Sequence, residues 1–122
     1  MRMKNVIVFN SREELLRLEV DKIVYFEANG NYTTVVAMNK LKATLGASLA
    51  KTEQILTRQM GDEAKRFMRV GKRFIVNLDY IYSVNMAKQC LILSDMEHFA
   101  YQLPVSKEAL RQMKELMTEL KI

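Results

Sequence analysis

Apolar residues along the chain gather in short runs that are separated by a few polar residues. Runs of roughly four to eight apolar, β-branched or aromatic residues between polar turns are typical of β-strands. Two segments show this most clearly, DKIVYFEANGNYTTVV at Asp21–Val36 and FMRVGKRFIVNLDYI at Phe67–Ile81. Over the whole chain the pattern predicts strands at Val6–Phe9, Ile23–Ala28, Tyr32–Met38, Lys42–Leu45, Phe74–Val76, Ile81–Met86, Cys90–Leu93 and Phe99–Leu103.

Some connections between these strands carry signals of their own. Asn29-Gly30-Asn31 joins two predicted strands, and Asn-Gly supplies the positive φ angles that a tight hairpin needs. Leu15–Leu18 fits either a strand beside Val6–Phe9 or, with Glu13-Glu14, a helical turn. Pro104 is expected to break the last strand's ladder. That strand alternates between an apolar face and a second face, with Phe99, Tyr101 and Leu103 opposite His98, Ala100 and Gln102, as a half-buried antiparallel strand does.

Two segments have helical periodicity instead. Ser48–Met60 has Ser48 as a candidate N-cap, a rough apolar face and Gly61-Asp62 as its end. The final segment follows Ser106, a second candidate N-cap. Its apolar positions recur at helical spacing, at Ala109, Leu110, Met113, Leu116, Met117 and Leu120. This face either packs on its own domain or forms a dimer or partner surface.

Length and composition indicate one globular domain over residues 1–122, mainly β with a C-terminal amphipathic helix. Hydrophobic residues make up 49% and charged residues 27%, which is the composition of a folded chain. No segment approaches the ~18 consecutive apolar residues of a membrane span. The start of the chain soon reaches charged residues and does not resemble a signal peptide. We therefore expect a cytoplasmic protein with no membrane partner.

Candidate residues for catalysis or metal binding are scarce. His98 is the only histidine and lies in a predicted strand, and Cys90 is the only cysteine. A zinc site needs about four ligands, so this pair does not make one. The four glycines are scattered and form no phosphate-binding loop. We expect no catalytic residues, no metal and no cofactor, and a packed thiol at Cys90.

The distribution of charge indicates more about function than the candidate catalytic and metal-binding residues do. The net charge is +5, and from Ala64 to Leu78 there are five basic side chains and no acidic one. Lys and Arg release condensed counterions when they dock on a phosphate backbone, so such a surface attracts nucleic acid. The basic turn of this stretch contains Arg69, Lys72 and Arg73.

Three segments in order resemble the LytTR family, the DNA-binding output domain of many bacterial response regulators. The first is Asp21-Lys22-Ile23 with Tyr25-Phe26-Glu27-Ala28 and Gly30-Asn31-Tyr32. The second is Phe67-Met68-Arg69-Val70 with Arg73-Phe74-Ile75-Val76-Asn77 and Ile81, and the third is Leu103-Pro104-Val105-Ser106 at the start of a helix. The resemblance is strongest from about residue 21 to residue 118.

The resemblance implies an elongated antiparallel β-sheet domain with short helices, whose loops enter the major groove of DNA. It implies a sequence-specific bacterial transcriptional regulator of a two-component system that binds double-stranded DNA, with repeated half-sites and a homodimer on DNA as expected arrangements. The family's pattern carries the DNA contacts onto Asn31, Tyr32, Thr33, Lys72, Arg73, Ser106 and Lys107. Arg69, in the same basic turn, is counted with them as a candidate DNA-binding residue. Many members carry His at the position of Gly71, so base preference here is expected to differ.

The residues leave several roles open. Ser106 either caps its own helix or donates to a phosphate, and Tyr32 lies either in the core or at the DNA. Asn31 either contacts DNA or adopts the positive φ of its turn. Arg69 lies in a run of alternating character, so its side chain either points inward or braces the loop. Two other functions compete: a protein-interaction module that uses the final helix, and an RNA-binding β-domain. Because the aromatic residues look interior, the RNA alternative is the weaker one.

Overall fold

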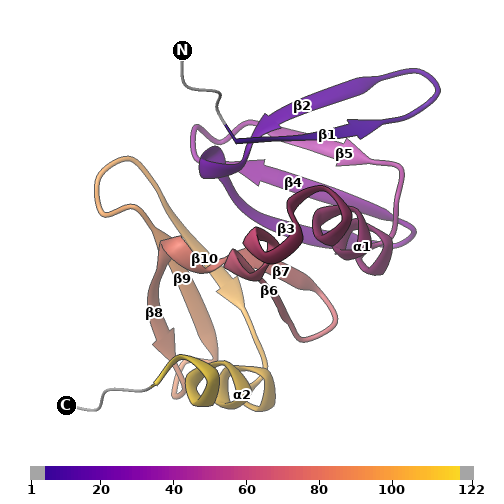
Figure 1. Ribbon diagram of the computed structural model, residues 1–122. Coiled ribbons are helices and arrows are strands. Elements are labelled where there is room, and N and C mark those ends of the chain that lie inside the picture. The colour runs from indigo at the N-terminus through magenta and orange to yellow at the C-terminus, as the bar shows by residue number, and fades with distance from the viewer. Residues whose placement is uncertain (1–4, 119–122) are drawn as a thin grey trace.

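The computed structural model describes residues 5–118, which form ten strands and two α-helices joined by turns and short 3₁₀ segments (Figure 1). The strands are β1 Val6–Asn10, β2 Leu15–Glu19, β3 Ile23–Asn29, β4 Tyr32–Ala37, β5 Lys42–Leu45, β6 Phe67–Val70, β7 Phe74–Asn77, β8 Ile81–Asn85, β9 Cys90–Ser94 and β10 Ala100–Pro104. The helices are α1 Leu49–Met60 and α2 Lys107–Met117, and the 3₁₀ segments are η1 Val20–Lys22, η2 Gly61–Arg66 and η3 Leu78–Tyr80. The prediction of a mainly β fold with a C-terminal helix is confirmed.

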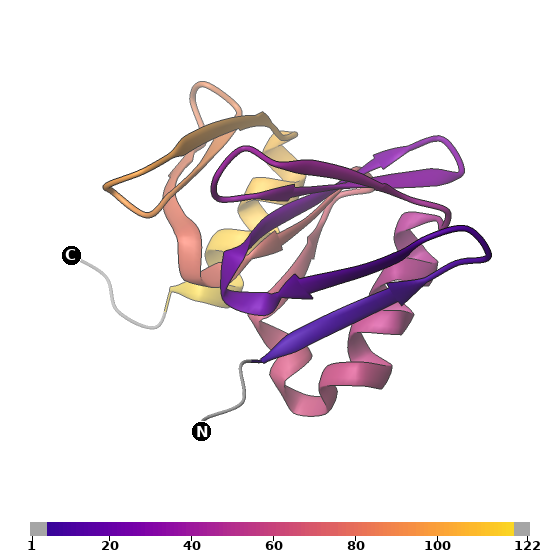
Figure 2. The same ribbon diagram turned by 90° about the horizontal axis from the view of Figure 1, so that it is seen from above.

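The central element is a five-stranded antiparallel sheet with the strand order β5-β4-β3-β7-β6. Its middle strands are buried at consecutive positions, Ile23 to Phe26 in β3 and Phe74 to Asn77 in β7. Consecutive burial means that both faces of a strand are covered, since successive side chains point to opposite faces. The hairpin β1-β2 and helix α1 cover one face, and the β10-β9-β8 sheet with α2 covers the other (Figures 1 and 2).

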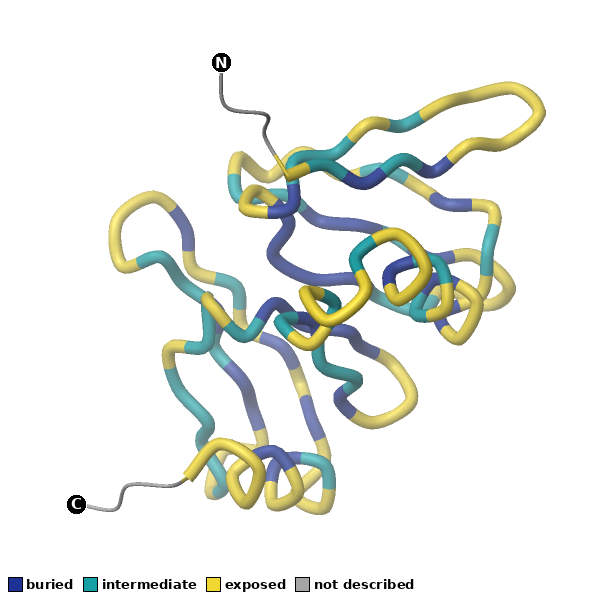
Figure 3. Tube along the Cα trace, in the orientation of Figure 1, coloured by how far each residue is buried: buried dark blue, intermediate teal, exposed yellow. Residues whose placement is uncertain are grey.

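Two adjacent aromatic residues of β3 show how the two faces differ. Phe26 makes edge contacts with Phe9 and Phe67, with ring centroids 6.2 and 5.8 Å apart. Tyr25 points the other way and packs against Phe74 and Tyr101, at 6.1 and 5.5 Å. Residues 5–118 therefore form two hydrophobic cores, one on each side of a shared sheet, and buried residues in Figure 3 follow that sheet.

The β3–β4 hairpin closes through a two-residue turn, Gly30-Asn31, between the paired residues Asn29 and Tyr32. Gly30 has φ +63°, whereas Asn31 is not among the residues with positive φ. Glycine at the first turn position is the pattern of a type II′ hairpin. The interpretation that Asn31 supplies the positive φ is therefore wrong, and its exposed side chain is not needed for that purpose.

Both predicted N-caps are confirmed. Ser48 Oγ accepts a hydrogen bond from the amide of Lys51 at 3.2 Å, and Ser106 Oγ accepts one from Ala109 at 3.3 Å. In α2 the apolar face packs on its own domain, because Leu110 and Met113 are buried. Toward the end of the helix Leu116 and Met117 are exposed, and Leu120 lies outside the described residues.

The structure decides one open alternative and refines two local predictions. Leu15–Glu19 is a strand paired with β1, and Glu13-Glu14 lie in the connecting turn rather than in a helix. The β10–β9 ladder ends at Pro104 itself, which pairs with Cys90 as the last residue of an edge strand, where a missing N–H is tolerated. His98 lies in the turn before β10, not in a strand.

We expect Asn77→Ala to lower the free energy of unfolding by about 2 kcal/mol. Asn77 is fully buried, its Nδ2 donates to the Ile23 carbonyl at 2.8 Å and its Oδ1 accepts from the Asp79 amide at 3.0 Å. The substitution would leave both backbone groups without these partners. Urea denaturation measures the change, and Gln102→Ala on the exposed face of β10 serves as the control that should leave stability nearly unchanged.

Candidate nucleic-acid interface

Strand pairing brings two of the predicted loops to the same edge of the central sheet. β3 ends at Asn29 and its antiparallel neighbour β7 begins at Phe74, which pairs with Glu27. The β6–β7 turn, residues 71–73, therefore lies beside the end of β3, where the β3–β4 turn begins. The amide of Ala28 donates to the Arg73 carbonyl at 2.7 Å and ties the two together.

The start of α2 joins the same edge. Gly71 has φ +62°, and a Cβ built on it would lie 3.7 Å from the Cβ of Ala109 in the first turn of α2. The β6–β7 turn is thus packed against this helix. In Figure 1 the β3–β4 turn, the β6–β7 turn and the start of α2 follow one another from the right edge toward the bottom. We call these three segments, residues 29–32, 71–73 and 105–107, the loop edge.

Most of the predicted contact residues are exposed on the loop edge. Tyr32 is 56% exposed, which decides between its two predicted locations: it is not in the core. The other exposed members are Asn31, Lys72, Arg73, Ser106 and Lys107. Ser106 keeps its hydroxyl proton free for an acceptor, because in the cap its oxygen only accepts.

Thr33 is the exception among these residues. Its side chain is fully buried, and its hydroxyl donates to the Ala47 carbonyl at 2.8 Å and accepts from Thr52 at 3.4 Å. The predicted DNA contact through this side chain is therefore corrected to a structural role. The reason is the alternation of a strand, which puts Thr33 on the opposite face from Tyr32.

The Arg69 side chain lies between the β6–β7 turn and helix α1 and supports the turn. Its Nη2 approaches the Lys72 carbonyl at 3.5 Å, its Nη1 lies 3.7 Å from Glu53 of α1, and its Nε is buried. About a third of the side chain is exposed. Of the two roles considered for Arg69, bracing the loop is the one this geometry fits.

Arg73 is exposed but has partners. Its Nε and Nη2 donate to the same oxygen of Glu27, at 2.8 and 2.5 Å, and its guanidinium carbon lies 5.1 Å from the centre of the Phe74 ring. Just upstream, Arg66 pairs with Asp21 at 2.8 Å and with Asp79 at 2.6 Å.

These ion pairs reduce the unpaired positive charge of the basic stretch between residues 64 and 78. Each of the three arginines between residues 64 and 78 has a carboxylate partner from elsewhere in the chain. Within residues 5–118, Lys72 of the β6–β7 turn has no ion pair and is exposed. Only a fraction of the five positive charges is therefore free to attract a phosphate backbone.

The sequence matches the LytTR family, described as the LytTr DNA-binding domain, over residues 13–118. This chain belongs to that family. A solved LytTr DNA-binding domain from Bacillus cereus, from a protein assigned as a methyl-accepting/DNA response regulator, has the same fold. It superposes with a TM-score of 0.66 at 24% identity, covering 94% of this chain and 98% of that one. Among curated proteins no match is found.

One basic residue of this LytTr domain was missed by sequence reasoning. Lys88 is exposed in the β8–β9 turn, whose Gln89 carbonyl accepts from the Val105 amide at 3.0 Å. That bond holds the turn beside the start of α2 and extends the loop edge. No local motif marks Lys88, and only the long-range pairing reveals it.

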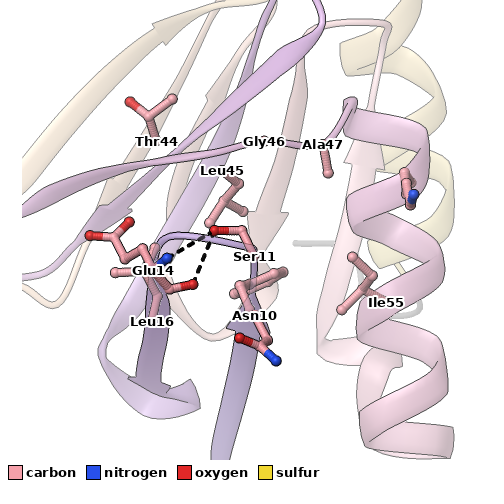
Figure 4. Close-up of a pocket in the computed structure, with 11 residues that line it drawn as sticks. Asn10, Ser11, Glu14, Leu16, Thr44, Leu45, Gly46, Ala47 and Ile55 are labelled. Atoms are coloured by element: carbon pink, nitrogen blue, oxygen red, sulfur yellow. Dashed lines mark hydrogen bonds between the residues drawn. The ribbon is translucent and has the colours of Figure 1, made fainter.

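Other features of the LytTr domain offer little chemistry. Among the described residues no group of three or more His, Cys, Asp or Glu could hold a metal ion, and neither helix is long and apolar enough to cross a membrane. A cavity of about 150 Å³ lies between the β1–β2 turn and α1 (Figure 4). Its Ser11 hydroxyl is occupied in closing the hairpin, accepting from the Glu14 amide at 3.2 Å and donating to the Glu14 carbonyl at 3.0 Å.

The single histidine stabilises a turn. Partial burial works against ionisation of Asp95, but the amides of His98, Glu97 and Phe99 and the His98 ring outweigh it and hold the pKa of Asp95 well below its usual range. In return, the hydrogen bond that His98 Nδ1 donates to Asp95 Oδ2 at 2.8 Å raises the pKa of His98 above its usual 6.5.

The sign of the resulting pH effect follows from the raised pKa. The charged pair stabilises the fold fully between about pH 4 and about pH 6.5, and the contribution is lost as the pH rises through the elevated pKa of His98 or falls through the lowered pKa of Asp95. We expect an NMR titration of the imidazole to show a pKa above 6.5 in the wild type. Asp95→Asn should lower it, and an unchanged midpoint in that variant would contradict the assignment.

Proposed function

We propose that the loop edge binds double-stranded DNA in a sequence-specific way by inserting its loops into the major groove, and that the protein acts as a bacterial transcriptional regulator of the response-regulator type. The observation that carries the proposal is the gathering of three separate loops with exposed donors on one edge of the sheet. A regulator of this kind works at the chromosome, so the proposal implies a cytoplasmic location.

The chemistry of the loop edge supports different tasks for different residues. Lys72 and Arg73 can donate to guanine O6 and N7 or to phosphate, and Asn31 can pair with adenine. Ser106 and Lys107 lie at the start of α2, where free backbone amides favour an anion such as a phosphate. Tyr32 adds an exposed ring with a hydroxyl beside Asn31.

The RNA alternative loses support. RNA-binding sheets carry exposed aromatic residues on adjacent strands, where bases stack. Here the exposed Tyr32 and Tyr82 belong to different sheets. The expectation that the aromatic residues are interior is wrong for these two, but their separation leaves no stacking platform between them.

Dimerisation on repeated half-sites remains part of the proposal. Leu116 is 71% exposed and Met117 is 42% exposed at the end of α2, a feature that suits contact with a second copy or another partner. Selection of binding sites from random duplex DNA tests the whole proposal. Enrichment of a short motif, repeated at a fixed spacing, is expected; strong self-association with no enriched motif would favour the interaction-module alternative.

Salt dependence gives a quantitative test of the electrostatic contacts. Lys72, Lys88 and Lys107 are exposed on or beside the loop edge, and neutralising about three phosphates predicts a slope of log K against log[salt] of about −2.7. Fluorescence anisotropy of a labelled duplex at several salt concentrations measures it. A slope near zero would rule out binding through the phosphate backbone.

Lys72→Ala should weaken binding to specific and scrambled duplexes alike, by roughly 1 kcal/mol, and flatten the salt slope by about one. The reason is that this unpaired, exposed ammonium suits a phosphate contact. Thermal stability should stay nearly constant, because the side chain has no ion pair within residues 5–118. Lys65→Ala is the matched control: Lys65 is also exposed but lies in η2, away from the loop edge, and should leave binding close to that of the wild type.

A further inference from the structure

The guanidinium of Arg73 is fixed by two supports of different kinds. Glu27 Oε2 accepts from both Nε and Nη2, and the ring of Phe74 lies under the guanidinium, 5.1 Å from its carbon. Glu27 itself lies within a strand, opposite Phe74 in the β3–β7 ladder. The carboxylate is thus anchored to a strand of the central sheet that is paired on both sides rather than to a loop.

This pairing uses only one edge of the guanidinium. Arginine carries five N–H donors, and Glu27 takes Nε–H and one hydrogen of Nη2. The two hydrogens of Nη1 and the second of Nη2 have no protein acceptor among the described residues. These N–H groups lie at the Nη1–Nη2 end of the planar guanidinium, and the Arg73 side chain is 57% exposed. Two adjacent donors of this kind match O6 and N7 of guanine.

We propose that Glu27 is a positioning residue that makes Arg73 a guanine reader rather than a phosphate contact. The inference rests on the proposed DNA-binding function and deepens it. A carboxylate beside the guanidinium offsets its positive charge and repels a phosphate, so the attraction of Arg73 to the DNA backbone is reduced. Hydrogen bonds to a base edge depend on donor geometry, and Glu27 improves that geometry by removing rotational freedom.

Lys72, the residue before Arg73, differs from it in both respects. Lys72 has no ion pair within residues 5–118, and its ammonium is a point charge without a fixed fork. The two residues of the β6–β7 turn therefore have different roles. Lys72 attracts the phosphate backbone of the DNA, and Arg73 selects a base. The selectivity of the turn then depends on Glu27, a residue of β3 that need not touch DNA.

The decisive variant is Glu27→Gln, which keeps the side-chain size and removes the charge. Released from its partner, Arg73 should reach nearby phosphates, so that affinity for a scrambled duplex rises about fivefold and the salt slope steepens by about one. Discrimination at one G·C base pair of the selected site should fall about tenfold, with the other positions unchanged. Circular dichroism and thermal melting check that the variant is folded.

Glu108→Gln is the matched control. Glu108 is an exposed residue of α2 whose carboxylate pairs with Arg111 at 2.8 Å, so its substitution changes the net charge by the same amount near the loop edge. It should raise affinity for specific and scrambled duplexes alike and leave every base preference intact. A change in charge alone is thereby separated from the loss of Arg73 orientation.

A second variant, Arg73→Lys, retains the positive charge but lacks the planar fork. It should lose discrimination at the same base pair as Glu27→Gln. The variant that carries both substitutions should show no further loss at that base pair, because each substitution removes the same contact between Arg73 and the base. This pattern is one that a merely structural role of Glu27 would not produce.

The outcomes separate this inference from the proposed function. A wild-type chain with no preference among duplex sequences overturns both. A selective wild type whose Glu27→Gln variant keeps full discrimination at every base pair overturns only the role of Glu27. An equal loss of discrimination at all positions would likewise overturn it, because a positioning residue for Arg73 affects one base pair.

Discussion

The burial of the central sheet on both faces is the constraint on which the rest of the structure depends. β3 and β7 contribute consecutive buried residues to two cores, so neither strand can shift by one residue without exchanging the core-facing sets. This fixed register determines where β3 ends and β7 begins. The loop edge is the consequence, because its turns are the ends of strands that cannot slide.

The start of α2 depends on the same constraint through packing. Leu110 and Met113 bury the helix in the core that contains Val24 and Val76, and this places Ala109 against the Gly71 turn. Most L residues adopt the positive φ of Gly71 only with strain, so glycine suits a turn held this tightly. The packing of α2 on the central sheet thus brings the third segment of the loop edge beside the other two.

Ion pairs determine how much of the positive charge near the loop edge is unpaired. Surface ion pairs contribute little to stability in general, and the pairs of Arg69 and Arg73 are partly exposed. Their larger effect is on which charges remain available to a ligand. By pairing its three arginines with carboxylates from other segments, the fold converts an apparently uniform basic stretch into three paired guanidinium groups and two lysines without an ion pair within residues 5–118.

The sequence by itself determined the class of fold, both helix N-caps, most strand positions and the three loop segments, because these depend on local periodicity, capping chemistry and short motifs. It misplaced what depends on distant partners. Thr33 was assigned to DNA because the motif includes it, yet its hydroxyl bonds to the Ala47 carbonyl. The acid-free stretch from residue 64 to residue 78 looked unpaired, yet Glu27 and Glu53 reach it from β3 and α1. Lys88 joined the loop edge only through a hydrogen bond between Gln89 and Val105. Charge and exposure at a site depend on which segments meet in space, and only the tertiary structure decided that.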